Sequence, residues 1–210
     1  MLITKIRSLF YLTTTGVLCL IFTGCGTTQP SQYYILSSIE DIGGGISATQ
    51  SRREKHIGLG PVNFPKYLDR SAIVVRQSDS EISINDMHRW AEPLEKNFTQ
   101  VLAHNLQTLL NNYYVTVFPW RNAKSIDYQV VIDVHRFDAD TNNNVMLSVQ
   151  WFVYRKADNR NLHFEKSIIT EKAENHTYDA LVKKQSEVVK IFSLELSDKL
   201  EEILRKLTES

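Results

Sequence analysis

The fold is decided by the stretch LEKNFTQVLAHNLQTLL, residues 94–110. Its apolar residues recur at the 3.6-residue period of an α-helix and so form one stripe along it. They are Leu94, Phe98, Val101, Leu102, Leu106, Leu109 and Leu110. Pro93 suits the first turn, where its missing N–H costs nothing, and Asn111-Asn112 ends the pattern. The stretch therefore predicts an amphipathic helix that buries one face against a core.

A second helix is predicted over residues 178–207. Its apolar residues also keep helical spacing; they are Leu181, Val182, Val188, Val189, Phe192, Leu196, Leu200, Ile203, Leu204 and Leu207. Pairs of opposite charge four residues apart lie off this stripe: Glu195/Lys199, Glu201/Arg205 and Glu202/Lys206. The outer face is too polar for a helix that spans a bilayer, so this helix too is expected to pack on the core.

Strands are predicted from period-two alternation and from β-branched and aromatic content. They cover residues 33–36, 57–62, 72–76, 81–85, 113–118, 128–137, 145–153 and 162–168. Pro61 and Pro65 are expected to end the second strand, and Leu162, Phe164 and Ile168 to form one apolar face of the last. The pattern predicts a single domain of the α/β (α+β) class, with a mixed β-sheet packed against two long amphipathic helices.

The first residues have the pattern of a signal peptide. Lys5 and Arg7 precede a mostly apolar run over residues 9–22, which is too short to cross roughly 30 Å of hydrocarbon as a helix. The run ends in Phe22-Thr23-Gly24-Cys25, which is similar to a bacterial lipobox, although leucine is commoner than Phe22 at its position. Residues 1–24 are therefore interpreted as a lipoprotein signal peptide, with Cys25 as the acylated residue. An ordinary secretory signal and an uncleaved membrane segment are the alternatives.

The charge balance and the cysteine content limit further which class of protein this can be. Removing residues 1–24 removes Lys5, Arg7 and no acidic residue, which lowers 24 basic residues to 22 against 24 acidic ones. Such a balance argues against a nucleic-acid partner. Cys19 leaves with the signal, so Cys25 has no partner for an internal disulfide. Residues 25–32 are expected to be the lipidated N-terminus and a short tether of at most about 25 Å.

No catalytic, metal or cofactor site is predicted. Residues 37–55 are predicted as a loop, because Gly43-Gly44-Gly45 lacks the Lys-Ser/Thr of a phosphate cradle. Residues 138–144 lack the glycine and glutamate of a calcium loop and are interpreted as a polar hairpin turn. Asp133 and His135 share a strand face, but two ligands do not make a metal site. His104 is expected to be exposed, and Trp90 either lines a functional groove or, as we favour, packs in the core.

Taken together, these residues resemble the PqiC-like family of ABC-transporter auxiliary lipoproteins. The resemblance rests on Cys25 after a short signal, on the runs YYIL at residues 33–36 and PKYLDR at 65–70, and above all on WAEPL at 90–94. Its motif residues are Trp90, Ala91, Pro93 and Leu94. It spans essentially the whole mature chain and implies that residues 33–210 form the auxiliary domain.

The resemblance implies a function that the residues alone do not give. Members are expected to be outer-membrane lipoproteins on the periplasmic side that help an MCE lipid-transport protein maintain membrane integrity, and a homo-oligomeric ring is possible. Gly26 in place of aspartate agrees with the outer membrane. The resemblance brings no catalytic residue and no cofactor. A lipoprotein regulator of a cell-wall enzyme is the alternative, which the short tether disfavours, and a hydrolase with an unrecognised site is a third hypothesis.

Overall fold

The computed structural model describes residues 30–39 and 55–208, and these form eight strands, two α-helices and two short 3-10 helices. The strands are β1 (Gln32–Tyr34), β2 (Lys55–Asn63), β3 (Ala72–Arg76), β4 (Ile82–Trp90), β5 (Tyr113–Val117), β6 (Tyr128–Asp140), β7 (Asn144–Arg155) and β8 (Arg160–Lys172). The helices are η1 (Lys66–Leu68), α2 (Leu94–Leu109), η2 (Ala123–Ser125) and α3 (Tyr178–Thr208). The predicted mixed sheet with two long helices is confirmed.

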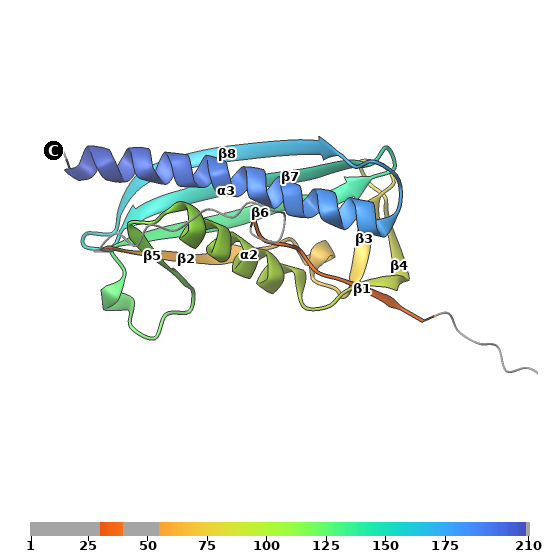
Figure 1. Cartoon of the computed structure of the whole chain (residues 1–210), viewed down its shortest axis with the longest axis horizontal. Coiled ribbons are helices and arrows are strands. Elements are labelled where there is room, and N and C mark those ends of the chain that lie inside the picture. Colours follow the sequence, from red (N-terminus) through yellow and green to blue (C-terminus); the bar gives the residue numbers. More distant parts are fainter. Residues whose placement is uncertain (1–29, 40–54, 209–210) are drawn as a thin grey trace, which may run out of the picture. The chain divides into compact units, whose positions relative to one another are not determined.

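One mixed sheet of eight strands organises the domain. The long strand β6 is its centre, because β2 pairs with its first half and β3 with its last residues, both in parallel. On its other side β6, β7 and β8 form an antiparallel meander. The short strand β1 runs parallel to β4 at one edge, and β5 runs parallel to β2 at another. In Figure 1, β1 and β5 lie at opposite ends of the molecule.

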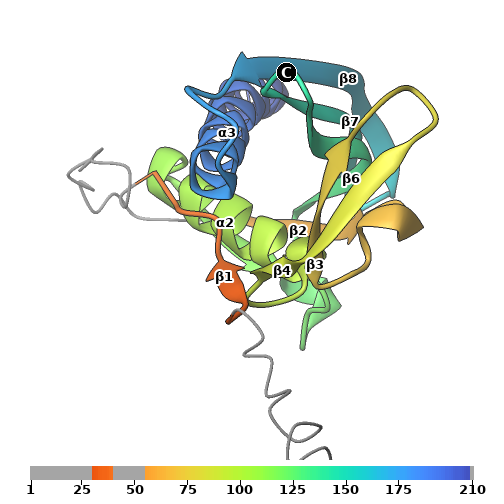
Figure 2. The ribbon, with the colours of Figure 1, turned by 90° about the vertical axis from the view of Figure 1, so that its right-hand side faces the viewer.

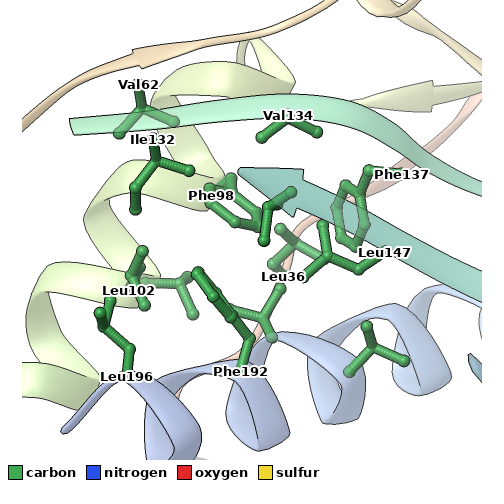
Figure 3. Packing of buried hydrophobic residues seen from close by; sticks show 14 of the residues in the cluster. Leu36, Val62, Phe98, Leu102, Ile132, Val134, Phe137, Leu147, Phe192 and Leu196 are labelled. Atoms are coloured by element: carbon green, nitrogen blue, oxygen red, sulfur yellow. The ribbon is translucent and has the colours of Figure 1, made fainter. Parts of the chain in front are cut away.

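Both helices cover the same side of this sheet. Seen end-on, the sheet curves from β8 through β7 and β6 to β2, and α2 and α3 close its open side (Figure 2). The core between them joins distant parts of the chain, with Phe98 of α2, Phe137 of β6 and Phe192 of α3 fully buried. Leu36, which follows β1, reaches the same cluster (Figure 3). The predicted apolar stripes of both helices therefore face one common core.

The apolar residues of β8 do not face this core as one set. Phe164 is 53% exposed and Ile168 is 59% exposed, whereas Ser167 and Ile169 point inward and are buried. Alternation alone cannot show which face of an edge strand is covered. The polar inner face is satisfied instead, because Ser167 accepts a hydrogen bond from the indole of Trp151 at 3.1 Å and donates one to Glu195.

Several predicted strand boundaries were wrong. Strand β2 continues through Pro61, where a cis Gly60–Pro61 bond and a register shift between Leu59 and Val62 accommodate the proline. Strand β4 extends to Trp90, because its second half pairs with β1, which local sequence does not reveal. Residues 37–39 belong to no helix or strand, as predicted for a loop, but they pack against the helices, and Ser38 and Ile39 are buried. Within the described residues, no helix is long and apolar enough to cross a membrane.

Candidate functional site

Residues 32–39, which we call the N-terminal strap, pair with β4 over the length of β1 and then contact both helices. The backbone N–H groups of Leu36 and Ile39 donate to the side-chain oxygens of Asn97 and Asn105 on α2, at 2.8 and 2.9 Å. The backbone N–H of Ser37 donates to the hydroxyl of Ser186 on α3 at 3.0 Å. The strap does not have a neighbouring strand on each side, so its backbone N–H groups need these side-chain acceptors. A buried N–H group that stays unpaired is costly. Polar side chains on the helices therefore fix the first part of the domain.

The motif residues 90–94 form the junction between this strap, β4 and α2. Trp90 ends β4 and is only 5% exposed, so its side chain packs in the core. Its backbone N–H donates to Ser71 at 2.7 Å, and the N–H of Ala91 donates to the carbonyl of Tyr34 at 2.8 Å. Pro93 then precedes α2, and its carbonyl accepts from the N–H of Asn97 at 3.0 Å. The motif thus ties three segments together through its backbone.

Glu92, which lies between Ala91 and Pro93 of the motif, orients the amide that holds the strap. Its Oε1 accepts a hydrogen bond from Nδ2 of Asn97 at 3.0 Å, which leaves Oδ1 of Asn97 free to accept from Leu36. Its Oε2 lies 3.4 Å from Nζ of Lys96, one turn into the helix. A charged acceptor strengthens the amide hydrogen bond. Glu92, Asn97 and Leu36 are therefore linked in this order by a continuous chain of hydrogen bonds.

A cavity of about 540 Å³ opens beside this junction, between η1, the end of β4 and the start of α2. Its lining combines the apolar Phe64, Trp90 and Pro93 with charged groups of both signs, including Arg70 and Glu95. A second hollow of about 450 Å³ also touches Glu95 and reaches the end of β5. Both hollows expose apolar side chains beside charged ones.

An aromatic cluster fixes β1 from its other side. His88 of β4 stacks on Tyr178, the first residue of α3, with ring centroids 3.8 Å apart. The hydroxyl of Tyr34 donates to Gln32 at 2.7 Å and shares a hydrogen bond with Nδ1 of His88 at 2.8 Å. Burial raises the pKa of Tyr34, and the charge of Asp179 raises it further. The cluster joins β1, β4 and α3.

A buried carboxylate lies on the outer side of β6, and sequence reasoning missed it. Asp138 is 0% exposed and accepts hydrogen bonds from Tyr67 at 2.8 Å, from Arg76 at 3.0 Å and from Arg136 at 2.7 Å. Burial and the neighbouring Asp138 charge raise the pKa of Tyr67 to about 12. The hydrogen bond to Asp138 also raises the pKa of Arg76. Arg136 lies two residues before Asp138 on β6, whereas Arg76 and Tyr67 lie 62 and 71 residues away, so the sequence shows only part of this cluster.

The predicted polar turn after Asp138 is shorter than expected, because β6 continues to Asp140. Burial alone would raise the pKa of Asp140, but hydrogen bonds from Asn144 and Asn142 outweigh it and lower the pKa. Asn143 has a φ of 65°, the left-handed conformation that asparagine tolerates. Asp140 therefore closes the turn by binding backbone and amide N–H groups.

The structure brings together only some of the residues singled out from sequence. Trp90, Ala91, Pro93 and Leu94 form the junction described above, whereas Cys25 lies outside the described residues. Asp133 accepts a hydrogen bond from Asn63 at 2.7 Å, while His135 and His104 are exposed. Within residues 30–39 and 55–208, no three His, Cys, Asp or Glu side chains converge as metal ligands. The buried asparagines and serines of the helices, which hold the strap, were not anticipated.

These features define a class of protein: a mixed α+β domain whose N-terminal strap is hydrogen-bonded to both helices. Residues 39–196 match the family described as the ABC-type transport auxiliary lipoprotein component, and the chain belongs to this family. The predicted resemblance is thereby confirmed. Membership makes the protein a lipoprotein of the cell envelope that serves a transporter as an auxiliary component.

Solved structures share the fold. The crystal structure of an uncharacterized protein matches with a TM-score of 0.67 at 19% identity, covering 82% of this chain and 99% of that chain. Protein XCC0632 from Xanthomonas campestris matches with a TM-score of 0.69 at 12% identity, covering 85% of this chain and 100% of that chain. At such identities the likeness shows the fold alone. No curated protein matches the chain in sequence.

Proposed function

We propose that this protein is a non-enzymatic docking subunit of an MCE-type, ABC-driven lipid-transport system, anchored by acylated Cys25 to the periplasmic side of the outer membrane. Family membership supports the transport role. The carrying observation is the strap, because residues 32–39 follow Cys25 closely and are bound to both helices. The strap therefore connects the anchored residue directly to the folded core.

The N-terminal sequence supports the anchor itself. Thr23 and Gly24 are the small residues that a lipoprotein signal peptidase requires before its cysteine, and Gly26 agrees with delivery to the outer membrane. Several acyl chains on one cysteine contribute about 0.8 kcal/mol per buried CH₂, enough for stable anchoring. A domain held this way needs no spanning helix.

The site chemistry supports docking over catalysis. The cavity beside Trp90 presents apolar surface and charges of both signs, and one of its two glutamates, Glu92, is already bound by Asn97 and Lys96. Such a mixed surface suits a protein partner. Docking at this subunit would hold the end of a periplasm-spanning MCE protein against the outer membrane.

Affinity purification after cross-linking in intact envelopes tests the partner. We expect the tagged wild-type protein to recover an MCE-domain protein, and Cys25→Ala to recover much less, since the variant no longer concentrates at the membrane. Repeated recovery of a cell-wall synthase in its place would favour the regulator hypothesis. Native mass spectrometry of the purified protein tests the ring: a closed multimer is expected, and a monomer at all concentrations would contradict it.

Radiolabelled palmitate tests the anchor separately. We expect the wild type to incorporate label and to fractionate with outer membranes, and Cys25→Ala to lose the label and become soluble in the periplasm. Cys19→Ala is the matched control, because that cysteine leaves with the signal peptide and should keep full labelling. Persistent labelling of Cys25→Ala would contradict the assignment of Cys25.

A further inference from the structure

We infer that the outward face of the N-terminal strap is a membrane contact: the side chains of Tyr33 and Ile35 rest in the interface of the phospholipid layer that holds the acyl anchor. This inference rests on the proposed acylation of Cys25 and names a second, non-covalent contact with the lipid surface. The argument uses the alternation of the strap, its distance from Cys25 and its rigidity.

The strap has two apolar faces. Tyr34 and Leu36 pack against the core, and Leu36 is only 4% exposed. Tyr33 is 66% exposed and Ile35 is 54% exposed, and since successive side chains of an extended segment alternate, both point to the same outer side. Packing in the core explains the apolar character of Tyr34 and Leu36, but it does not explain that of Tyr33 and Ile35. The second pair is a tyrosine beside an aliphatic residue, and amphipathic aromatic rings are enriched where membrane meets water.

The length of chain before the strap limits where this outer face can be. Residues 26–31 separate Cys25 from β1, so Tyr33 lies at most roughly 29 Å along an extended chain from the acylated residue. The headgroup region of a bilayer occupies about 5–7 Å on each side. The strap is therefore the part of the described domain that the anchor holds nearest to the lipid.

The strap is also rigid enough to present these side chains without further ordering. Its backbone pairs with β4 and receives the N–H of Ala91 at Tyr34, while Asn97 binds Leu36 directly after Ile35. Contact with lipid therefore requires only that the side chains of Tyr33 and Ile35 become buried, because folding has already ordered the backbone of the strap. Phe118, another exposed apolar residue, directly follows β5, and β5 lies at the opposite end of the domain from β1 (Figure 1).

Single fluorescent labels test the inference in the full, acylated protein. Once Cys25 is alkylated, the mature chain has no other cysteine, so Tyr33→Cys and Ile35→Cys each give one reactive thiol. The labelled proteins are reconstituted in vesicles of phosphatidylethanolamine and phosphatidylglycerol, with doxyl-labelled phosphatidylcholine as the lipid quencher and iodide as the aqueous quencher. Phe118→Cys and Ile168→Cys are the matched controls at exposed positions.

We expect lipid quenching at positions 33 and 35 to be severalfold stronger than at 118 and 168, with the opposite order for iodide. Iodide quenching at 33 and 35 equal to that at the controls would overturn the inference. Protection from both quenchers would also overturn it, because a second copy or a partner would then cover the strap. Circular dichroism checks that each variant is folded. If the protein is acylated but the labels are accessible to iodide, the membrane contact of the strap is refuted and the proposed anchor is not. If the protein is not acylated, the proposed anchor is refuted as well.

Discussion

Asn105 binds Ile39 across a distance of 66 residues in sequence: its Oδ1 accepts the backbone N–H of Ile39 at 2.9 Å. The same side chain donates from Nδ2 to the hydroxyl of Ser193 at 2.9 Å, and Ser193 in turn donates to the carbonyl of Val189. Asn105 and Ser193 are fully buried. One amide therefore links the strap, α2 and α3, and it determines how the N-terminal end of the domain is held.

Replacing this amide should weaken the fold strongly. Asn105→Leu leaves the buried N–H of Ile39 without its acceptor, at a cost of about 1–3 kcal/mol, and Ser193 keeps only its hydrogen bond to Val189. Urea unfolding should show this loss in the free energy of unfolding. Gln100→Leu, at an exposed position of the same helix, is the control and should change stability by less than about 0.5 kcal/mol. Equal effects of both substitutions would contradict the role of Asn105.

The sequence predicted the helices and most strands because their apolar residues repeat at a fixed local period. It did not predict the strap, since the acceptors on Asn97, Asn105 and Ser186 become visible only when α2 and α3 lie side by side. Likewise, β4 looked shorter than it is, because its last residues pair with the distant strand β1 and meet β3 again only after a register shift, at Arg89 and Ala72. The motif at Trp90 was found from resemblance, whereas its function as a junction required the structure.

The covered and uncovered faces of β8 should respond differently to substitution. Ile169→Ala removes a side chain that is 9% exposed and should cost about 2–4 kcal/mol. Phe164→Ser removes a ring that is 53% exposed and rests on Phe152, so the loss should stay below about 1 kcal/mol. Thermal and urea unfolding of both variants measure the contrast. A larger loss for Phe164→Ser would mean that the outer face of β8 is covered in solution.

Removing the buried carboxylate should be among the most damaging single changes. Asp138→Ala leaves the guanidinium groups of Arg76 and Arg136 facing each other without their shared acceptor, and breaking one side of a buried ion pair costs about 3–5 kcal/mol. Asp158→Ala removes a carboxylate paired with Arg155 on the surface and should have little effect. Urea unfolding at neutral pH compares them. A similar stability of the two variants would show that Asp138 is dispensable.

Tyr67 should make stability depend on pH in the alkaline range. Its pKa is about 12 in the folded protein, against the ordinary 10.0, so the unfolded chain releases this proton first as the pH rises. The contribution is fully present below about pH 10 and is lost as the pH rises to about 12. The stability advantage of wild type over Tyr67→Phe should therefore shrink across this window in urea titrations. An advantage that stays constant to the upper limit would contradict the raised pKa.

Gly58 should be irreplaceable while Trp120 keeps its position. A Cβ added to Gly58 in the middle of β2 would overlap the indole of Trp120 and come within 2.9 Å of Cγ2 of Ile126. The indole is held there by a hydrogen bond from Nε1 to the carbonyl of Thr116 at 3.1 Å. Gly58→Ala should therefore cost about 1–3 kcal/mol through overpacking and shift the tryptophan fluorescence. In a Trp120→Ala background the same change should cost at least about 0.5 kcal/mol less, and strict additivity would show that the indole does not cause the strain.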